Sequence, residues 1–364
     1  MGSATTFDLA GTYNLKDVSI SDIANGQTVE YSPTETPGAV SSDIGKLTLA
    51  HTTPLGLTAQ INLEMNGSGP GALTLDKLTV GPGLASLHID SESSGATGNV
   101  ITDFLNVADS VTVTGGTHLT LGSAAGPYLF KGGIIDASAD TGGVAVWLGD
   151  VGLNAGNAAQ SFIGGTGPDF ANVLNSGGDV INFSKSGADI VQFNTTTGPL
   201  APLADNVHGG FFYNHVLGFT GTDSVNVNVA NMNATLPSSL TTTQDVAVAA
   251  GDATNPFVYT SGTDVNASKA AYNFVDIVTP VSTGGLNASQ AFEAAIAGGE
   301  IETKGPSVSV MGSFYDATNS QAVYFVDVHA TRDILGTDPI KVVGLVHMTE
   351  ATYLSSVKVF AHYV

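Results

Sequence analysis

The stretch SFIGGTGPDFANVLNSGGDVINFSKSGADIVQF, residues 161–193, contains three aspartates spaced ten residues apart, namely Asp169, Asp179 and Asp189. A glycine stands two places before each aspartate, at Gly167, Gly177 and Gly187. The pattern Gly-x-Asp is typical of a tight turn, because glycine adopts backbone angles closed to other residues and aspartate bonds to nearby backbone. The stretch therefore predicts three turns at regular intervals.

A short apolar segment follows the second and third of these turns. Ile181 and Phe183 are matched ten residues later by Val191 and Phe193. Residues i and i+2 of a strand face the same side, so each turn leads into a strand with two inward side chains. A fourth copy, Gly221-Thr222-Asp223, precedes residues 224–227, and a weaker echo without the glycine surrounds Asp109.

Alternation of apolar and polar residues recurs in much of the rest of the chain. Short runs with this period of two occupy residues 73–75, 87–89, 111–113, 119–121 and 144–146. Gly, Ser, Asn or Asp bounds the runs, as expected for strands. Their irregular spacing fits the stacked rungs of a β-solenoid whose loops differ in length, and a β-sandwich is the alternative.

The composition of the sequence and the elements that it predicts change after about residue 232. A polar segment with Pro237 and Pro256 precedes a helix candidate at residues 287–300, whose end is marked by a glycine pair. Four further strands are expected at residues 307–315, 321–329, 341–348 and 356–363. We therefore predict a β-solenoid over residues 1–232 and a β-rich cap with one helix over residues 233–364.

The charge balance excludes several classes of protein. The chain has 10 Lys and Arg residues and 32 Asp and Glu residues, which gives a formal charge of −22. Such a charge repels nucleic acid and acidic lipids and attracts cations. The chain has no cysteine, so disulfides and thiolate metal sites are excluded. No apolar run is long enough for membrane insertion, and no signal peptide is evident. The opening Met-Gly-Ser looks like a cloning scar, which suggests a piece of a longer protein.

Stacked Gly-x-Asp turns have the chemistry of a calcium site. Calcium takes about six to eight oxygens from carboxylates, carbonyls and water, more than one turn supplies. If each ten-residue unit is half a coil, Asp169 and Asp189 lie on one edge and Asp179 on the opposite edge. Turn formation without metal is the alternative. The predicted calcium site residues are Gly165, Gly167, Asp169, Gly177, Asp179, Gly187, Asp189, Gly221 and Asp223.

Residues 164–172, GGTGPDFAN, resemble the nonapeptide G-G-x-G-x-D-x-U-x of the RTX family of secreted calcium-binding proteins. Residues 134–174 and 215–230 are similar to the repeat region of RTX-class bacterial surface-layer proteins, and residues 292–364 resemble their type I secretion segment. The resemblance implies a right-handed parallel β-solenoid with a partial calcium β-roll, in an extracellular protein that self-assembles.

The chain also departs from the RTX pattern. Ala171 replaces a large apolar residue, Pro168 occupies a variable position, and the period is ten instead of nine. The second and third units keep only Gly-x-Asp, and Lys185 places a cation beside the third. These departures predict one or two calcium ions and no long ladder.

The sequence thus predicts a structural protein of a bacterial surface layer that assembles with copies of itself when calcium is present. Cell-surface polysaccharide is a second candidate partner, and an RTX-type adhesin or biofilm-matrix protein is the alternative function. An enzyme is not expected. Asp90 and Glu92 could form a carboxylate pair, but ordinary surface acids explain them as well, and the eight histidines follow no metal-binding spacing.

Overall fold

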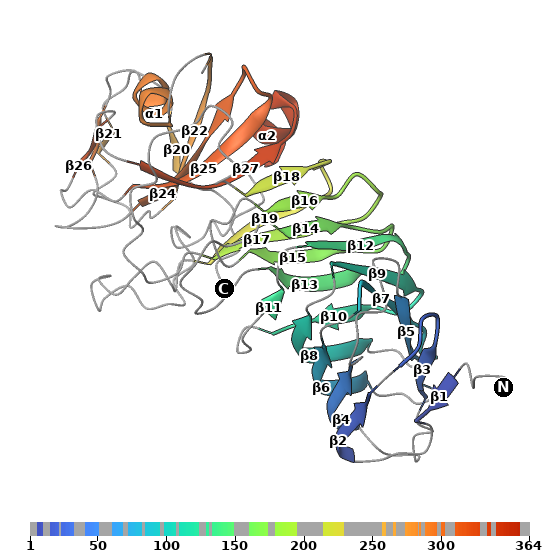
Figure 1. Cartoon of the computed structure of the whole chain (residues 1–364). Coiled ribbons are helices and arrows are strands. Elements are labelled where there is room, and N and C mark those ends of the chain that lie inside the picture. Colours follow the sequence, from blue (N-terminus) through green and yellow to red (C-terminus); the bar gives the residue numbers. More distant parts are fainter. Residues whose placement is uncertain are drawn as a thin grey trace. The chain divides into compact units, whose positions relative to one another are not determined.

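In the computed structural model, the chain divides into two compact units, Met1–Asp189 and Ile190–Val364 (Figure 1). The residues described in it are 6–9, 15–21, 23–32, 41–50, 60–67, 72–81, 84–94, 98–106, 109–123, 129–130, 133–148, 160–173, 179–194, 214–228, 257–259, 265–266, 274–282, 284, 288–296, 300–302, 310–327, 333–335 and 340–356.

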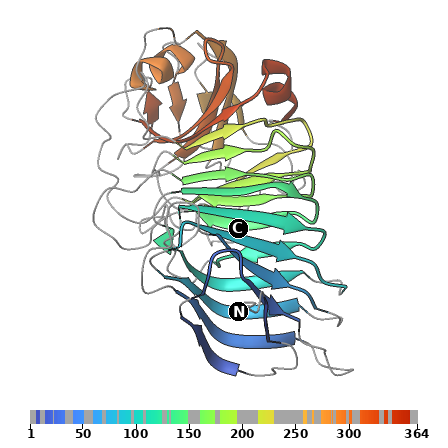
Figure 2. The same cartoon turned by 45° about the vertical axis from the view of Figure 1, so that its right-hand side comes forward.

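In the first unit, strands alternate along the chain between two parallel sheets (Figure 2). One sheet contains β1 (Thr6–Asp8), β3 (Thr28–Tyr31), β5 (Gln60–Met65), β7 (Ser86–Ser91), β9 (Ser110–Gly115), β12 (Gly133–Asp140), β14 (Gln160–Ile163) and β16 (Val180–Asn182). Each of these strands pairs in parallel with the next in this order.

The other sheet of this unit follows the same rule. It contains β2 (Leu15–Ile20), β4 (Ser41–Leu49), β6 (Ala72–Val80), β8 (Asn99–Asn106), β10 (Leu119–Leu121), β13 (Val144–Leu148) and β15 (Phe170–Val173), with β11 (Leu129–Phe130) beside β8. All neighbours are parallel. The predicted all-β fold with parallel strands is confirmed.

The register of the first sheet stacks apolar side chains directly on one another. Leu63 of β5 lies opposite Ile89 of β7, and Ile89 lies opposite Val113 of β9. All three are at most 1% exposed, as alternation of inward and outward residues requires. Burying each such side chain stabilises the fold by about 1.5–3 kcal/mol. The core of the unit is therefore a set of apolar columns that run across the strands.

The second unit combines parallel and antiparallel pairs. One sheet contains β18 (His215–Leu217), β27 (Ile340–His347), β25 (Gln321–Asp327), β24 (Val310–Asp316), β22 (Phe274–Val281) and β20 (Phe257–Tyr259), of which β27, β25 and β24 are antiparallel neighbours. Smaller pairings join β17 (Ile190–Asn194) to β19 (Ser224–Asn228), and β23 (Glu300–Glu302) to both β21 (Val265–Asn266) and β26 (Asp333–Leu335).

This unit has two helices among its described residues where the sequence analysis predicted one. α1 (Ala288–Ile296) confirms the candidate at residues 287–300, and α2 (Glu350–Ser356) was missed. Thr349 caps α2, since its Oγ1 accepts a hydrogen bond from the Thr352 amide at 3.1 Å. Tyr353 is 1% exposed and stacks on Tyr315, which anchors the helix.

The predicted strands at 307–315, 321–329 and 341–348 correspond to β24, β25 and β27. Of the strand predicted at residues 356–363, Ser356 belongs to α2, and residues 357–363 lie outside the described part of the chain. The division of the chain at residue 232 stays a prediction.

Candidate metal centre

The predicted site lies where the chain turns from one sheet of the first unit to the other. The turn between β12 and β13, residues 141–143, stacks on the turn between β14 and β15, residues 164–169: the Thr166 amide donates a hydrogen bond to the carbonyl of Asp140 at 3.0 Å. A Cβ on Gly167 would lie 2.3 Å from the amide nitrogen of Gly143, and one on Gly165 would lie 2.2 Å from the Asp140 carbonyl oxygen. These two predicted site glycines are therefore required by the close stacking of the turns.

Asp169 points into the protein from the end of the second turn. Its side chain is 2% exposed, and both carboxylate oxygens accept backbone hydrogen bonds. Oδ1 accepts from the Val144 amide and Oδ2 accepts from the Gly165 amide, each at 2.8 Å. Because Ala145 lies opposite Phe170 in the β13–β15 register, Val144 is the counterpart of Asp169 one strand earlier. The carboxylate thus ties its own turn to the preceding one.

Asp189 repeats this arrangement one step further along the chain. It is 1% exposed, and its Oδ1 accepts a hydrogen bond from the Asp169 amide at 2.9 Å. A Cβ on Gly187 would lie 2.3 Å from Asp189 Oδ1, so only glycine leaves room for the carboxylate. Asp169 and Asp189 therefore share an edge, as the sequence predicted from the ten-residue period.

Asp179 lies on the other sheet, immediately before β16. Its Oδ1 accepts a hydrogen bond from the Gln160 amide at 2.9 Å, and it is 3% exposed. The register Ser161 to Val180 makes Gln160 the counterpart of Asp179 one strand earlier. The same device thus occurs at the start of strands in both sheets, and Asp179 is separate from the Asp169–Asp189 edge.

Asp140, which the sequence analysis did not select, belongs to this edge. It is fully buried, and its Oδ1 accepts a hydrogen bond from the Gly143 amide at 2.6 Å. Its Oδ2 is also buried and has no hydrogen-bond partner among the described residues. The signal was present in the sequence, since Asp140 precedes Gly142 and Gly143 just before a strand, but the glycines follow the aspartate instead of preceding it.

Burial makes these carboxylates costly to ionise. Removal from water raises the pKa of Asp140, Asp169 and Asp179 to about 6 in each case. Backbone hydrogen bonds act in the opposite direction, and at Asp140 the negative charge of Asp169 raises the pKa further. At neutral pH this edge therefore carries buried negative charge that a proton or a cation would relieve.

The oxygen atoms at this edge are of the type that calcium binds, but the side chains supply fewer of them than calcium requires. Carboxylates and carbonyls are the ligands that calcium prefers, and Asp140 Oδ2 is an oxygen without a partner in the described part of the chain. Among the residues that the structure describes, however, no three His, Cys, Asp or Glu side chains gather closely enough to hold a metal ion. A calcium ion beside Asp140 and Asp169 would thus need backbone carbonyls and water for most of its ligands.

The remaining predicted residues are placed elsewhere. In the second unit, Asp223 closes a turn: its Oδ2 accepts hydrogen bonds from the Thr220 amide at 2.6 Å and the Thr220 hydroxyl at 3.0 Å. A Cβ added to Gly221 would meet no atom of the described residues within 4 Å, so the turn does not demand glycine there. Gly177 lies outside the described residues.

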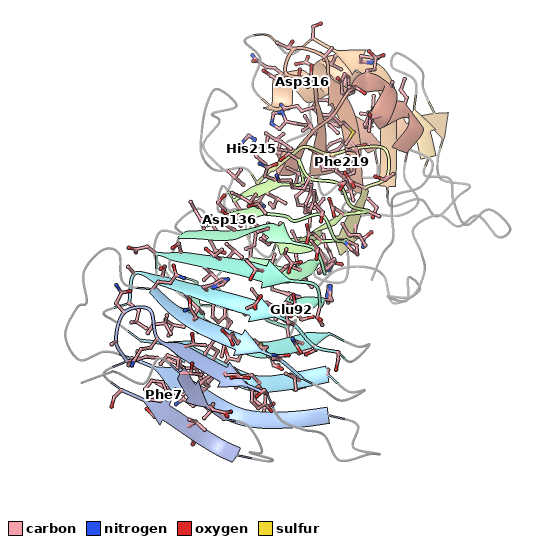
Figure 3. The ribbon with its side chains drawn as sticks, turned by 90° about the vertical axis from the view of Figure 1, so that its right-hand side faces the viewer. Phe7, Glu92, Asp136, His215, Phe219 and Asp316 are labelled. Carbon is pink, nitrogen blue, oxygen red and sulfur yellow. The ribbon has the colours of Figure 1, made fainter. Side chains whose placement is uncertain are left out.

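The candidate carboxylate pair Asp90 and Glu92 divides between different partners. Asp90 Oδ1 accepts a hydrogen bond from the Thr114 hydroxyl at 2.7 Å, and Thr114 contacts His88. Glu92, the residue that follows β7 (labelled in Figure 3), accepts a hydrogen bond from the Gly116 amide at 3.0 Å. Each carboxylate thus bonds to the neighbouring strand or turn, as structural surface acids do.

Comparisons with known proteins assign no family to this arrangement, because no family model, curated protein or solved structure matches the chain. Within the described residues, no helix is both long enough and apolar enough to cross a membrane.

Proposed function

We propose that this chain is a structural, non-enzymatic protein of a bacterial surface layer, in which calcium bound at stacked aspartate turns stabilises the fold and promotes self-assembly. The observation that carries the proposal is the buried acidic edge formed by Asp140, Asp169 and Asp189, in a chain of net charge −22. Such an edge opposes folding at neutral pH unless a cation or protons neutralise it.

The fold that we propose is a right-handed parallel β-solenoid with a partial calcium β-roll at residues 161–193. Support comes from the strand order of the first unit: apart from the short β11, consecutive strands alternate between the two sheets, and each pairs in parallel with the preceding strand of its own sheet. The stacked turns are a further support, because stacking brings oxygens from two turns to one place. A lengthwise repeat of this kind suits a protein that builds an extended layer.

Calcium would connect folding to location. In a calcium-poor cytoplasm the buried carboxylates disfavour the compact state, which keeps the chain competent for export by type I secretion. Outside the cell, calcium binds the folded state and stabilises it by mass action. The protein would then act at the cell surface, with other copies of itself as the main partner and surface polysaccharide as a second.

Size-exclusion chromatography with light scattering, run in EDTA and in millimolar calcium with electron microscopy of the calcium sample, tests the proposal. We expect sheets or large oligomers only with calcium. A monomer that binds calcium would favour the alternative function, that of an RTX-type adhesin or matrix protein. Equal elution and equal circular dichroism in both buffers would overturn the role of calcium and leave the aspartates as turn residues.

A further inference from the structure

A hydrogen bond between two histidines joins strands of the second unit that are far apart in the sequence. Nδ1 of His215, on β18, lies 3.4 Å from Nε2 of His347, which ends β27 and comes 132 residues later. The strands are parallel neighbours with His215 opposite Leu345, so His347, two residues further on, projects from the same face of the sheet. The pair therefore links β18 to β27 through side chains as well as through the backbone.

The geometry of the two rings is that of an N–H···N hydrogen bond. The ring centroids are 5.7 Å apart, the planes differ by 20°, and the two facing nitrogens lie on the line between the centroids. One ring donates its N–H and the other accepts with its lone pair, because a neutral imidazole has one nitrogen of each kind. The bond therefore requires that one of the two facing nitrogens carries no proton.

This requirement limits the number of protons that the pair can hold. Two neutral rings satisfy the bond, and a proton added to the outer nitrogen of the donating ring leaves it intact. A second added proton would occupy the accepting nitrogen, and two N–H groups of positively charged rings would then face each other across 3.4 Å. The linked pair thus takes up one proton, whereas two separated histidines take up two.

The surroundings of the pair do not compensate for a second positive charge. Burial lowers the pKa of both histidines, and the charge of His347 lowers the pKa of His215 further. In the register, His347 lies opposite the neutral Gln321 of β25, and Gln321 lies opposite Asp316 of β24. The carboxylate of Asp316 acts to raise the pKa of His347, but this effect is smaller than that of burial.

Asp316, labelled with His215 in Figure 3, is engaged by its own turn and by Gln321. It is 2% exposed, and its oxygens accept hydrogen bonds from the Thr318 amide at 2.9 Å, Asn319 Nδ2 at 2.7 Å and Gln321 Nε2 at 3.2 Å. It therefore acts on the histidines from two strands away. The other charged residues of the neighbouring elements lie at the far ends of β27 and β25, or are exposed on α1 and α2: Lys341, Asp327, Glu293 and Glu350.

We propose that the His215–His347 pair is an acid-sensitive link in the second unit, which holds β18 against β27 at neutral pH and releases it when both rings become protonated. The link is complete above about pH 6.5, the ordinary value for histidine, and weakens as the pH falls, because the open form then binds one more proton than the closed form. The ratio of closed to open form decreases by up to about ten-fold per pH unit in this range.

This link is separate from the proposed role of calcium, since calcium takes oxygen ligands. It also has the opposite pH dependence from the buried aspartates of the first unit. The pKa values of Asp140, Asp169 and Asp179 are raised, so those residues stabilise the fold on acidification. Three carboxylates outweigh one histidine proton in a melt of the whole chain, so the link is tested by a measurement that resolves individual strands.

Hydrogen exchange of backbone amides, followed by mass spectrometry on the full chain in excess calcium chloride, is such a measurement. After correction for the intrinsic pH dependence of exchange, we expect peptides that cover β18 and β27 to lose protection by about five- to ten-fold between pH 7.5 and pH 5.5. Peptides that cover β7 and β9, where His88 contacts Thr114, should not lose protection. Equal or greater protection of β18 and β27 at pH 5.5 would overturn the proposal.

The variant His347→Gln separates this link from a general effect of acid. Glutamine can still form a hydrogen bond with His215 but takes up no proton, so the loss of protection at pH 5.5 should disappear. His88→Gln is the matched control in the first unit and should behave like the parent chain. A His347→Gln variant that loses protection of β18 as the parent does would contradict the role of the pair.

A measurement on the unchanged chain covers the case in which the variant fails to fold. Exchange of the imidazole C2 hydrogen in heavy water depends on the protonation of the ring, and mass spectrometry over a series of pH values gives the pKa of each histidine. We expect one of His215 and His347 to titrate at least about one pH unit below the ordinary value of about 6.5, and both to return to that value in urea. Titration of both rings near 6.5 in the folded chain would overturn the link.

Discussion

The backbone amide of Asp169 donates a hydrogen bond to Oδ1 of Asp189 at 2.9 Å, so the backbone of Asp169 is held by the side chain of Asp189. The side chain of Asp169 in turn accepts a hydrogen bond from Val144 one strand earlier. A carboxylate in this position replaces a backbone acceptor at the start of a strand and simultaneously buries a charge. The edge therefore has a structural role that needs no metal and an electrostatic cost that a metal would relieve.

Stability should rise as pH falls from 7.5 to 5 in EDTA. The pKa of about 6 for Asp140, Asp169 and Asp179 is above the value of about 3.9 for an unfolded aspartate, so the folded state binds protons more tightly. Their contribution to stability is complete below about pH 4 and is lost as pH rises through about 6. Thermal melts should show a higher midpoint at pH 5 than at pH 7.5, and a flat or falling midpoint on acidification would contradict the ionisation that we infer.

The substitution Asp140→Asn tests whether Asp140 is a calcium ligand or only a turn residue. Asparagine keeps the oxygen that accepts the Gly143 amide and replaces the unpartnered Oδ2 by a neutral group. In EDTA at pH 7.5 we expect this variant to be more stable than the parent by about 1–3 kcal/mol, because a buried charge is lost. In calcium the parent should become as stable as the variant, because the ion neutralises Asp140. The stability of the variant should increase less on addition of calcium.

Urea unfolding in EDTA and in calcium measures both effects, with Asp109→Asn as the matched control because Asp109 is exposed. A variant that is stabilised equally in the two buffers would show that Asp140 does not take part in calcium binding. A variant that is destabilised in EDTA would contradict the view that the Asp140 charge opposes folding.

Gly167→Ala and Gly221→Ala should behave very differently although both glycines precede an aspartate by two residues. A methyl group on Gly167 would lie 2.3 Å from the Gly143 amide nitrogen, whereas one on Gly221 meets nothing within 4 Å among the described residues. We expect Gly167→Ala to destabilise the fold by about 2–4 kcal/mol through displacement of the stacked turns. Gly221→Ala should change stability by less than about 1 kcal/mol in either direction. Equal effects in chemical unfolding would show that the turns can separate without cost.

The period of two in the sequence was sufficient to predict the strands in which alternation is clear, such as those around residues 87–89 and 111–113, because alternate burial is what a pleated sheet imposes. Ile181, Phe183, Val191 and Phe193 are all at most 1% exposed, as expected from their positions. The shared edge of Asp169 and Asp189 also followed from spacing alone. These features are local or repeat at a fixed interval, so the sequence displays them directly.

Features that depend on distant contacts could not be predicted in the same way. His215 and His347 are neighbours only because β18 pairs with β27, and no short-range pattern specifies that pairing. Asp140 was missed because what distinguishes it, a buried oxygen without a partner among the described residues, is set by the turn stacked on it. α2 was missed because its short apolar face is completed by Tyr315 on another element.

A last prediction concerns the second unit, where Gly344 of β27 accommodates the ring of Phe193. A Cβ on Gly344 would lie 2.3 Å from Cε1 and Cζ of that ring, which is 1% exposed and packed against Tyr324 with centroids 5.8 Å apart. Because the ring is confined, Gly344→Ala should destabilise the unit by about 1–3 kcal/mol through overpacking. Phe193→Leu removes the end of the ring and should itself cost about 1–2 kcal/mol.

The double variant Gly344→Ala/Phe193→Leu should be more stable than the sum of the single effects predicts, since the smaller side chain leaves room for the methyl group. Gly284→Ala serves as the control, because its nearest contact would be 3.9 Å away, at Thr318. Unfolding followed by circular dichroism gives the four free energies of the cycle. A coupling energy near zero would mean that the ring of Phe193 does not exclude a side chain at position 344, because the backbone of β27 can move away from the ring.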